Sequence, residues 1–270
     1  MTALAPVTMT AIERLEAALA SKAIPAKEAQ TCARLLENLR RPVRVGLIGT
    51  PEAGPAELLA GILDQNVIPA GFATPTMELR YGATPSGSAT LADASVIERD
   101  RLPDADLMRP DPVFLQVSAP FEALRRMSFL HLSLSEDTSE RRQARYWAAN
   151  RVELTLWCSN GFPQAEAVLW ENAPELMKNH AFLVATGAHD NPGVLRQRVG
   201  AEFEGVFAVD LRAGAQARGL GQLMRRINAD IDEAHLADLD AARLFLHSFG
   251  QGDAARASLA APDADLGAVL

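Results

Sequence analysis

Two glycines five positions apart, Gly49 and Gly54, are the residues of this sequence whose spacing suggests a binding function. The spacing matches the phosphate-binding loop GxxxxGK[ST], in which backbone N–H groups surround phosphate oxygens. In such a loop the lysine neutralises phosphate charge, and the serine or threonine hydroxyl binds Mg²⁺. The sequence therefore predicts the frame of a phosphate-binding loop at residues 49–56.

The residues that would carry the chemistry of this loop are replaced. Pro55 stands where the lysine belongs and removes both a cation and a backbone N–H. Ala56 removes the hydroxyl that would bind the metal ion. Glu52 adds a carboxylate, whose repulsion of a phosphate in a poorly solvated site costs on the order of several kcal/mol. We expect no cofactor and no magnesium, with GTP or GDP as the alternative, and the Glu52 carboxylate in the place of a phosphate.

A plain turn between a strand and a helix explains the same residues as well. Proline is common at the first position of a helix, and a glycine before it suits the start of a helix in any α/β protein. The two glycines alone do not separate these interpretations, so the surrounding elements must decide.

Buried-strand patterns and amphipathic-helix patterns alternate along residues 42–233. This alternation predicts right-handed crossovers and a mostly parallel sheet with helices on both faces, which is an α/β fold. The expected strands are residues 43–48, 77–81, 113–117, 129–134, 152–158, 181–185 and 206–210, with an accessory hairpin within residues 77–97. The expected helices are residues 56–63, 139–150, 164–177, 192–201 and 220–234.

Short helical additions flank this α/β domain. Residues 1–41 contain two amphipathic helices separated by a break at residues 23–25. A further helical pattern covers residues 234–249, and we expect it to pack on the α/β domain. Residues 250–270 are rich in Ala, Asp and Gly without periodicity, which predicts a flexible tail.

The stretch after the loop resembles the dynamin-like and related bacterial large P-loop GTPases. Residues 68–71 (IPAG) and 74–76 (TPT) look like the first switch of that family, and residues 79–82 (LRYG) look like the strand that follows it. The resemblance covers roughly residues 41–233. It implies a GTPase-like P-loop fold and includes Thr76 in a degenerate nucleotide site.

Two later motifs of that family are also degenerate in this chain. Residues 132–136 read LSLSE where the family has D-T-P-G, so the aspartate that reaches magnesium through water is missing. The guanine-reading N/T-K-x-D motif falls on TGAHD at residues 186–190. The resemblance implies that Asp190 could still bond to guanine, whereas Ala188 replaces the lysine that stacks on the base.

Composition excludes several classes of function. A formal net charge of −8 argues against nucleic-acid binding and against a general attraction to anionic lipid. The five histidines have no paired ligand spacing, so we predict no metal site. Cys32 and Cys158 are far apart in sequence, which predicts free thiols and a reducing compartment. Without a leader pattern or a membrane-length apolar stretch, we expect a cytoplasmic protein whose membrane association is at most peripheral.

These features predict a pseudo-GTPase, which is more an interaction module than an enzyme. Its role would be that of a protein-interaction scaffold or regulatory subunit, with an active GTPase paralogue or a second copy of itself as partner. The alternative is a divergent GTP-binding protein or slow GTPase of the dynamin-like family acting at a membrane, with Arg44 or Arg80 supplying the lost cation. Among the tryptophans, Trp157 is expected in the core, while Trp147 and Trp170 are left open between core and interface.

Overall fold

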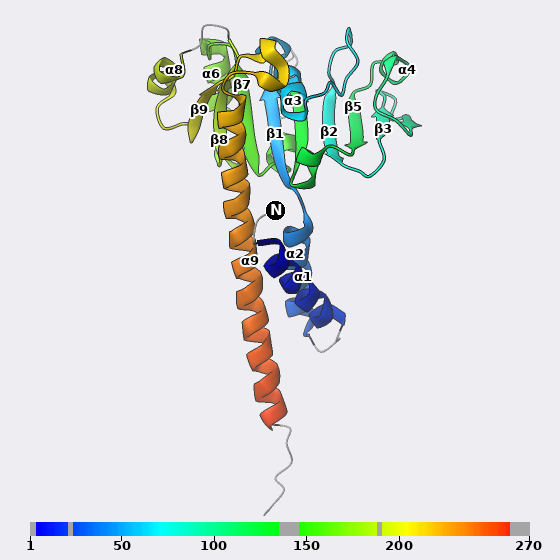
Figure 1. Ribbon diagram of the computed structural model, residues 1–270, viewed down its shortest axis with the longest axis vertical. Coiled ribbons are helices and arrows are strands. Elements are labelled where there is room, and N and C mark those ends of the chain that lie inside the picture. The colour runs from blue at the N-terminus through cyan, green and yellow to red at the C-terminus, as the bar shows by residue number, and fades with distance from the viewer. Residues whose placement is uncertain (1–3, 21–23, 135–145, 188–190, 260–270) are drawn as a thin grey trace, which may run out of the picture. The chain divides into compact units, whose positions relative to one another are not determined.

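The structure is a computed structural model, and it describes residues 4–20, 24–134, 146–187 and 191–259 (Figure 1). The chain divides into two compact units. One is the α/β unit, Pro42–Asn228, and the other is a helical unit formed by Met1–Arg41 with Ala229–Leu270. The boundary therefore follows residue 228 rather than the expected residue 233.

The α/β unit contains a sheet of nine strands in the order β4-β3-β5-β2-β6-β1-β7-β8-β9. The central strands are parallel, because β1 pairs in parallel with β6 and β7, and β8 pairs in parallel with β7 and β9. The predicted mostly parallel α/β fold is confirmed. The strands are β1 Val43–Gly49, β2 Thr76–Tyr81, β3 Ser86–Thr90, β4 Val96–Arg99, β5 Phe114–Ala119, β6 Met127–Ser133, β7 Leu154–Ser159, β8 Ala181–Ala185 and β9 Gly205–Ala208.

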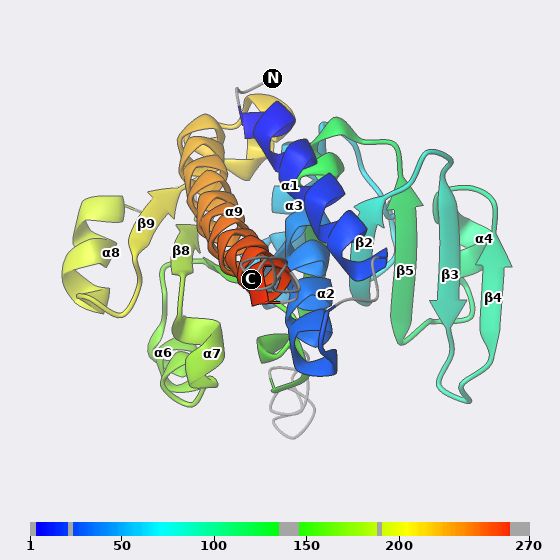
Figure 2. The ribbon, with the colours of Figure 1, turned by 90° about the horizontal axis from the view of Figure 1, so that it is seen from below.

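The other half of the sheet contains antiparallel pairs. β2 is antiparallel to β6 and parallel to β5, while β3 is antiparallel to both β5 and β4. Figure 2 shows β2, β5, β3 and β4 side by side, with β4 at the edge. A hairpin of β3 and β4 extends the sheet, but it lies at residues 86–99 rather than within the expected residues 77–97, and β2 pairs with β5 and β6 instead.

Both faces of the central strands are covered. Successive side chains of a strand point to opposite faces, and both Leu47 and Ile48 of β1 are fully buried, as are Phe182 and Leu183 of β8. Such unbroken apolar runs are what a parallel sheet between two layers requires. The core cluster on one face joins Ile48 and Leu183 to aromatic residues of the following segments.

The helices of this unit are short. They are α3 Pro55–Leu63, α4 Ala105–Met108, α6 Gln164–Glu171, α7 Glu175–Lys178 and α8 Pro192–Val199, with 3₁₀ helices η1 Pro51–Ala53, η2 Glu122–Arg125 and η3 Leu211–Gln216. The single helix expected at residues 164–177 is wrong, since it is divided into α6 and α7. Pro174 precedes α7 with an extended backbone, and proline cannot continue a helix interior. Most of the helix expected at residues 139–150 lies outside the described residues.

The helical unit has its own core. It consists of α1 Leu4–Ala20, α2 Ala26–Arg40 and the later part of α9 Leu220–Leu259. Residues 234–249, which were expected to pack on the α/β domain, contribute their buried residues to a core shared with α1 and α2. This core contains Ala11, Ile12, Leu15, Ala18, Cys32, Leu35, Leu39, Leu239, Ala242 and Leu246.

Helix α9 is continuous from Leu220 to Leu259, without the expected division at residue 234 (Figure 1). Residues 250–259, which belong to the expected flexible tail, continue this helix, and residues 260–270 lie outside the described part. Adding residues to an existing helix costs little, so two glycines near residue 250 do not end it. Both cysteines are free and buried. No helix in the described ranges is long and apolar enough to cross a membrane.

Candidate functional site

The loop predicted from the two glycines lies at the carboxyl end of β1. Gly49 ends the strand, and a Cβ atom there would lie 2.9 Å from the carbonyl oxygen of Cys158, so a side chain does not fit. Gly54 has φ 67° and ψ 38°, a left-handed conformation that glycine adopts without strain, and it precedes the first residue of α3. The structure thus gives each glycine a backbone role in the turn.

Two amides of the loop donate to carbonyl groups of the loop itself. The Ala53 N–H donates to the Thr50 carbonyl at 3.0 Å, and the Gly54 N–H donates to the Pro51 carbonyl at 3.1 Å. These bonds form η1, and the prolines at positions 51 and 55 have no N–H. A phosphate-binding loop needs its amides directed at the ligand, so this one has few amides to offer.

The two acidic side chains near the loop are placed differently from the expectation. Glu52 is exposed on η1. Glu57, in the first turn of α3, brings its Oε2 atom to 3.4 Å from the position that a Cβ on Gly54 would occupy. A carboxylate is favourable beside the N-terminus of a helix. The carboxylate next to the N-terminal end of α3 is therefore that of Glu57.

Two residues distant in sequence hold the loop in place. Thr186, just beyond β8, directs its hydroxyl at the carbonyl oxygens of Ala53 and Ser159, at 2.8 and 3.1 Å. Leu211 of η3 places its Cδ1 2.6 Å from the Cβ position of Gly54, so its side chain fills the space beside this glycine. Sequence reasoning assigned neither residue a role, although Thr186 is the first residue of the TGAHD segment. Asp190 and Ala188 of that segment lie outside the described residues.

Arg44, the first cation considered as a replacement for the lysine, lies far from the loop. It is five residues before Gly49, about 16 Å along an extended strand. Its guanidinium instead pairs with the Glu78 carboxylate at 3.0 Å and donates to the Arg151 carbonyl at 3.1 Å. Arg44 therefore does not replace the lysine.

Arg80, the second such cation, lies at the same distant end of the sheet. Strand β2 is antiparallel to β6, and Leu79 pairs with Phe129, which in turn pairs with Val45 of β1. The next residue along β2 is therefore farther still from the loop. The Arg80 side chain donates to the Ser118 hydroxyl at 3.2 Å.

Thr76 lies at the end of the sheet that carries the loop. It is the first residue of β2, and its neighbour Met77 pairs with His131, which pairs with Leu47. The structure thus brings Thr76 to the same edge as Gly49, with β6 between their strands. Of the five predicted site residues, four share this edge, and Asp190 is not described.

His131 fastens the segment before β2 to the centre of the sheet. Its side chain is 1% exposed, and its Nδ1 lies 3.1 Å from the Pro75 carbonyl oxygen, which requires Nδ1 to carry the proton. Burial lowers the pKa of His131 from 6.5 to about 4, although the bond to Pro75 opposes this shift. The folded protein therefore holds His131 in its neutral form.

We expect the stability of the α/β unit to fall as the pH drops from 6.5 to 4. In this window the unfolded chain binds a proton at His131 that the folded chain does not, so the free energy of unfolding decreases by about 3 kcal/mol in all. His131→Asn should remove this decrease in the free energy of unfolding between pH 6.5 and pH 4. Urea unfolding across the pH range measures it. His180→Asn is the control, because His180 is exposed and its φ of 60° suits Asn. Equal pH profiles for wild type and His131→Asn would contradict the assignment.

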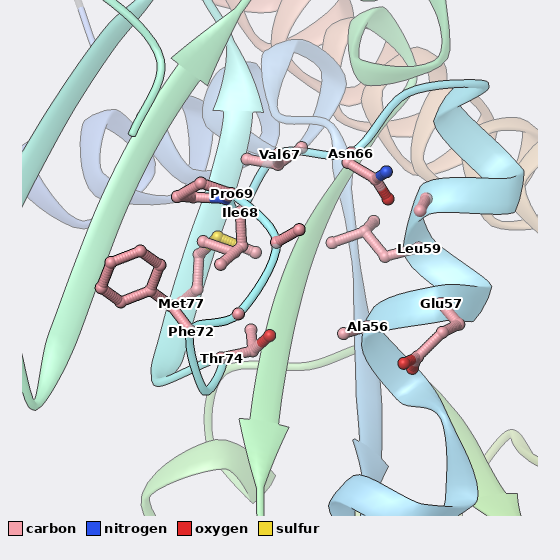
Figure 3. Close-up of a pocket in the computed structure, with 13 residues that line it drawn as sticks. Ala56, Glu57, Leu59, Asn66, Val67, Ile68, Pro69, Phe72, Thr74 and Met77 are labelled. Carbon is pink, nitrogen blue, oxygen red and sulfur yellow. The ribbon is translucent and has the colours of Figure 1, made fainter. Parts of the chain in front are cut away.

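A pocket lies beside the loop, between α3 and residues 66–77 (Figure 3). Its volume is about 240 Å³. Glu57 and Ala56 belong to its wall on the side of α3, and Thr74 belongs to its wall on the other side. Among the residues that the structure describes, no group of three or more His, Cys, Asp or Glu side chains could hold a metal ion.

No protein-family model matches this chain, and no curated protein matches it in sequence. Two solved structures of an oligomerised bacterial dynamin pair, described as sensing and tethering membranes over long range, match 95% of this chain. Their TM-scores are 0.64 and 0.67 at 12% and 11% identity, and the chain spans 57% of the length of each. The G domain of the T. maritima FeoB iron transporter matches 72% of this chain and 99% of its own length, with a TM-score of 0.39 at 14% identity.

Identities this low establish the fold and nothing finer. The TM-scores of 0.64 and 0.67 over 95% of this chain show that its architecture agrees with that of the two dynamin structures. The chain therefore has the fold of a large P-loop GTPase of the bacterial dynamin type.

Proposed function

We propose that this protein is a pseudo-GTPase, a GTPase-fold protein that does not hydrolyse GTP and acts as a protein-interaction scaffold or regulatory subunit. The observation that supports this most is the loop after β1, whose Ala53 and Gly54 amides bond within the loop. GTP hydrolysis in this fold depends on amides that cradle the phosphates, on a lysine and on a hydroxyl that binds Mg²⁺. Pro55 and Ala56 supply neither of the last two groups.

The surroundings of the loop add to this argument. The Glu57 carboxylate lies beside Gly54, where it would repel a phosphate, and Leu211 fills the other space beside the same glycine. The two arginines that could have replaced the lysine are engaged at the far end of the sheet. Neither of these two arginines is therefore placed to supply the lost cation.

A partner of the same fold class suits this proposal. The two similar structures are of an oligomerised dynamin pair, so in that system one GTPase-fold protein assembles with another. For the present chain we propose either self-association or binding to an active GTPase. Sedimentation analysis of the purified protein tests the first, and affinity isolation followed by identification of a GTPase tests the second.

We expect no binding of GTP, GDP or ATP at millimolar concentration, with or without Mg²⁺. The physical reason is the loss of the cation and of the loop amides, which together supply most of the affinity for phosphate. Isothermal titration calorimetry measures this directly, with an active GTPase under the same conditions as the control. Micromolar affinity for any of the three nucleotides would show that the non-binding proposal is wrong.

A further inference from the structure

Strand β9 lies at the end of the sheet opposite β4 (Figure 2). Among the strands that the structure describes, it pairs only with β8. Both edge strands have four residues, but they differ in their protection. β4 reads VIER and carries two exposed charged side chains, whereas β9 reads GVFA and has neither a charge nor a proline. An edge strand without such protection can pair with another chain.

The outward side of β9 carries backbone groups that no described strand satisfies. The Val209 N–H, directly after the strand, donates to the Ala185 carbonyl of β8 at 2.9 Å. Successive residues of a strand direct their N–H and C=O groups to opposite sides, so Val206 and Ala208 direct theirs away from β8. The backbone of Gly219 covers the Ala208 carbonyl. The Val206 N–H, the Val206 carbonyl and the Ala208 N–H therefore remain for an added strand.

A groove of about 640 Å³ lies beside this edge. Its wall contains the consecutive residues 206–210 and, just before α9, Arg218. The strand is anchored from within the unit, since the Phe207 ring meets the Phe182 ring in a T-shaped arrangement with centroids 5.7 Å apart. A fixed edge beside an open groove lets a peptide bind without rearranging the sheet, which lowers the cost of binding.

The surroundings of the groove are basic. From α8 to the end of the α/β unit, residues 192–228 contain six arginines and three acidic residues, a formal net charge of +3 in a chain whose total is −8. Asp210 already pairs with Arg212 at 2.7 Å. Arg218 forms no ion pair with any residue that the structure describes. Charge complementarity therefore favours an acidic partner.

We propose that the open edge of β9 binds an extended acidic segment of a partner protein, which adds one more strand to the sheet. Backbone hydrogen bonds to Val206 and Ala208 supply the pairing, and a carboxylate of the segment pairs with Arg218. A second copy of this chain is a poor occupant, because pairing β9 with β9 would bring two basic surfaces together. A lipid surface offers no alternating N–H and C=O groups. The site rests on the proposed scaffold role, but not on the absence of GTP binding.

Titration of the full chain with blocked five-residue peptides tests the proposal. The acidic probe is Glu-Val-Thr-Val-Glu, and its basic counterpart has lysine in place of both glutamates. A third peptide keeps the acidic sequence but is N-methylated at its three central residues, so that neither of its edges can donate. We expect the acidic probe to bind at least about tenfold more tightly than the other two. Equal binding of either counterpart overturns the proposal, and so does no binding of the acidic probe at about 1 mM.

Hydrogen exchange of single amides, followed by NMR, locates the bound peptide. In the free protein the Val206 and Ala208 amides should exchange rapidly, while β8 protects those of Phe207 and Val209. The acidic probe should slow exchange at Val206 and Ala208 by at least about tenfold. Slowing at other strands alone overturns the proposal. Protection of Val206 without peptide, in a protein that sediments as a dimer, assigns the edge to a second copy and also overturns it.

Val206→Pro and Val206→Thr separate the backbone contact from the side chain. Proline removes the outward N–H, which β8 does not use, and proline is tolerated in edge strands. Threonine keeps this N–H at nearly the same volume. Val206→Pro should weaken binding of the acidic probe about tenfold, while Val206→Thr should bind as the wild type does. Both should keep the wild-type circular dichroism spectrum, and equal affinities of the two variants overturn the proposal.

Arg218→Gln and Arg34→Gln test the charge. Both arginines are exposed, but only Arg218 lines the groove, and Arg34 belongs to the helical unit. Arg218→Gln should weaken binding of the acidic probe about tenfold, whereas Arg34→Gln should leave it unchanged. Neither change touches the backbone of β9, so this pair decides the proposal even if Val206→Pro does not fold. An equal effect of both changes overturns it.

Vesicles containing phosphatidylserine distinguish an anionic membrane from a peptide. The wild type should bind the acidic probe in solution and should not float with the vesicles. Flotation that is lost in Arg218→Gln, without binding of the acidic probe, assigns the basic surface to a membrane and overturns the proposal. That result leaves the expected absence of nucleotide binding unaffected, because neither probe nor readout involves a nucleotide.

Discussion

Gly219→Ala is expected to lower the free energy of unfolding of the α/β unit by roughly 3 kcal/mol or more. Gly219 precedes α9 with φ 89°, a conformation that strains any residue with a Cβ atom. A Cβ there would also overlap the carbonyl oxygen of Ala208, at the end of β9. Because that neighbour is backbone in a strand, the strand itself would have to move. Urea unfolding followed by tryptophan fluorescence measures the loss, since all three tryptophans lie in this unit.

Gly200→Ala is the matched control for this prediction. Gly200 also has a positive φ, 59°, but nothing lies within 4 Å of the Cβ position. Only the backbone strain of φ 59° with ψ −128° remains, so the expected loss is about 1 to 3 kcal/mol. Similar losses in the two variants would mean that the close approach to Ala208 contributes nothing to stability.

Trp170→Ala is expected to cost about 3 to 5 kcal/mol of stability. Trp170 is 1% exposed on α6. Its ring stacks on Phe203 with centroids 4.2 Å apart and meets the edge of Trp157 at 5.2 Å. Removing the indole leaves a cavity at the centre of an aromatic cluster, and it also removes the favourable ring geometry. Thermal and urea unfolding, followed by circular dichroism, measure the loss.

Val168→Ala tests whether the effect belongs to the cluster or to the helix. Val168 lies on the same helix, and its side chain is 46% exposed. Its replacement should change stability by about 0.5 kcal/mol or less, as for most surface positions. If both variants lose the same amount, the stability of α6 itself rather than the aromatic cluster determines the result.

The strands were predictable because their signal is local. Residues 181–185 are continuously apolar, and β8 occupies the same five residues, all of them buried. The same reasoning identified Trp157 as a core residue, but it left Trp170 open. The sequence around a single tryptophan on a short helix does not indicate whether its side chain is buried. Trp170 is buried because Phe203 and Trp157 pack around it in the folded chain.

The packing partners of the helices were less predictable, because they depend on contacts between residues far apart in the chain. Residues 234–249 carry an apolar pattern that indicates a helix but does not say what it packs against. The structure shows Leu239, Ala242 and Leu246 packed with α1 and α2, more than 190 residues earlier in the chain. A pattern defines an apolar face, whereas the surface that covers this face is a property of the whole fold.

The sequence by itself determined that the loop after β1 lacks the lysine and the hydroxyl of a phosphate-binding loop, since Pro55 and Ala56 have no such groups in any conformation. Only the tertiary structure decided which carboxylate lies beside Gly54, because Glu52 turns outward on η1 while Glu57 points back along α3. Side-chain chemistry is fixed by residue type. Placement depends on backbone angles and on partners from distant strands, as when Thr186 reaches the Ala53 carbonyl 133 residues away in sequence.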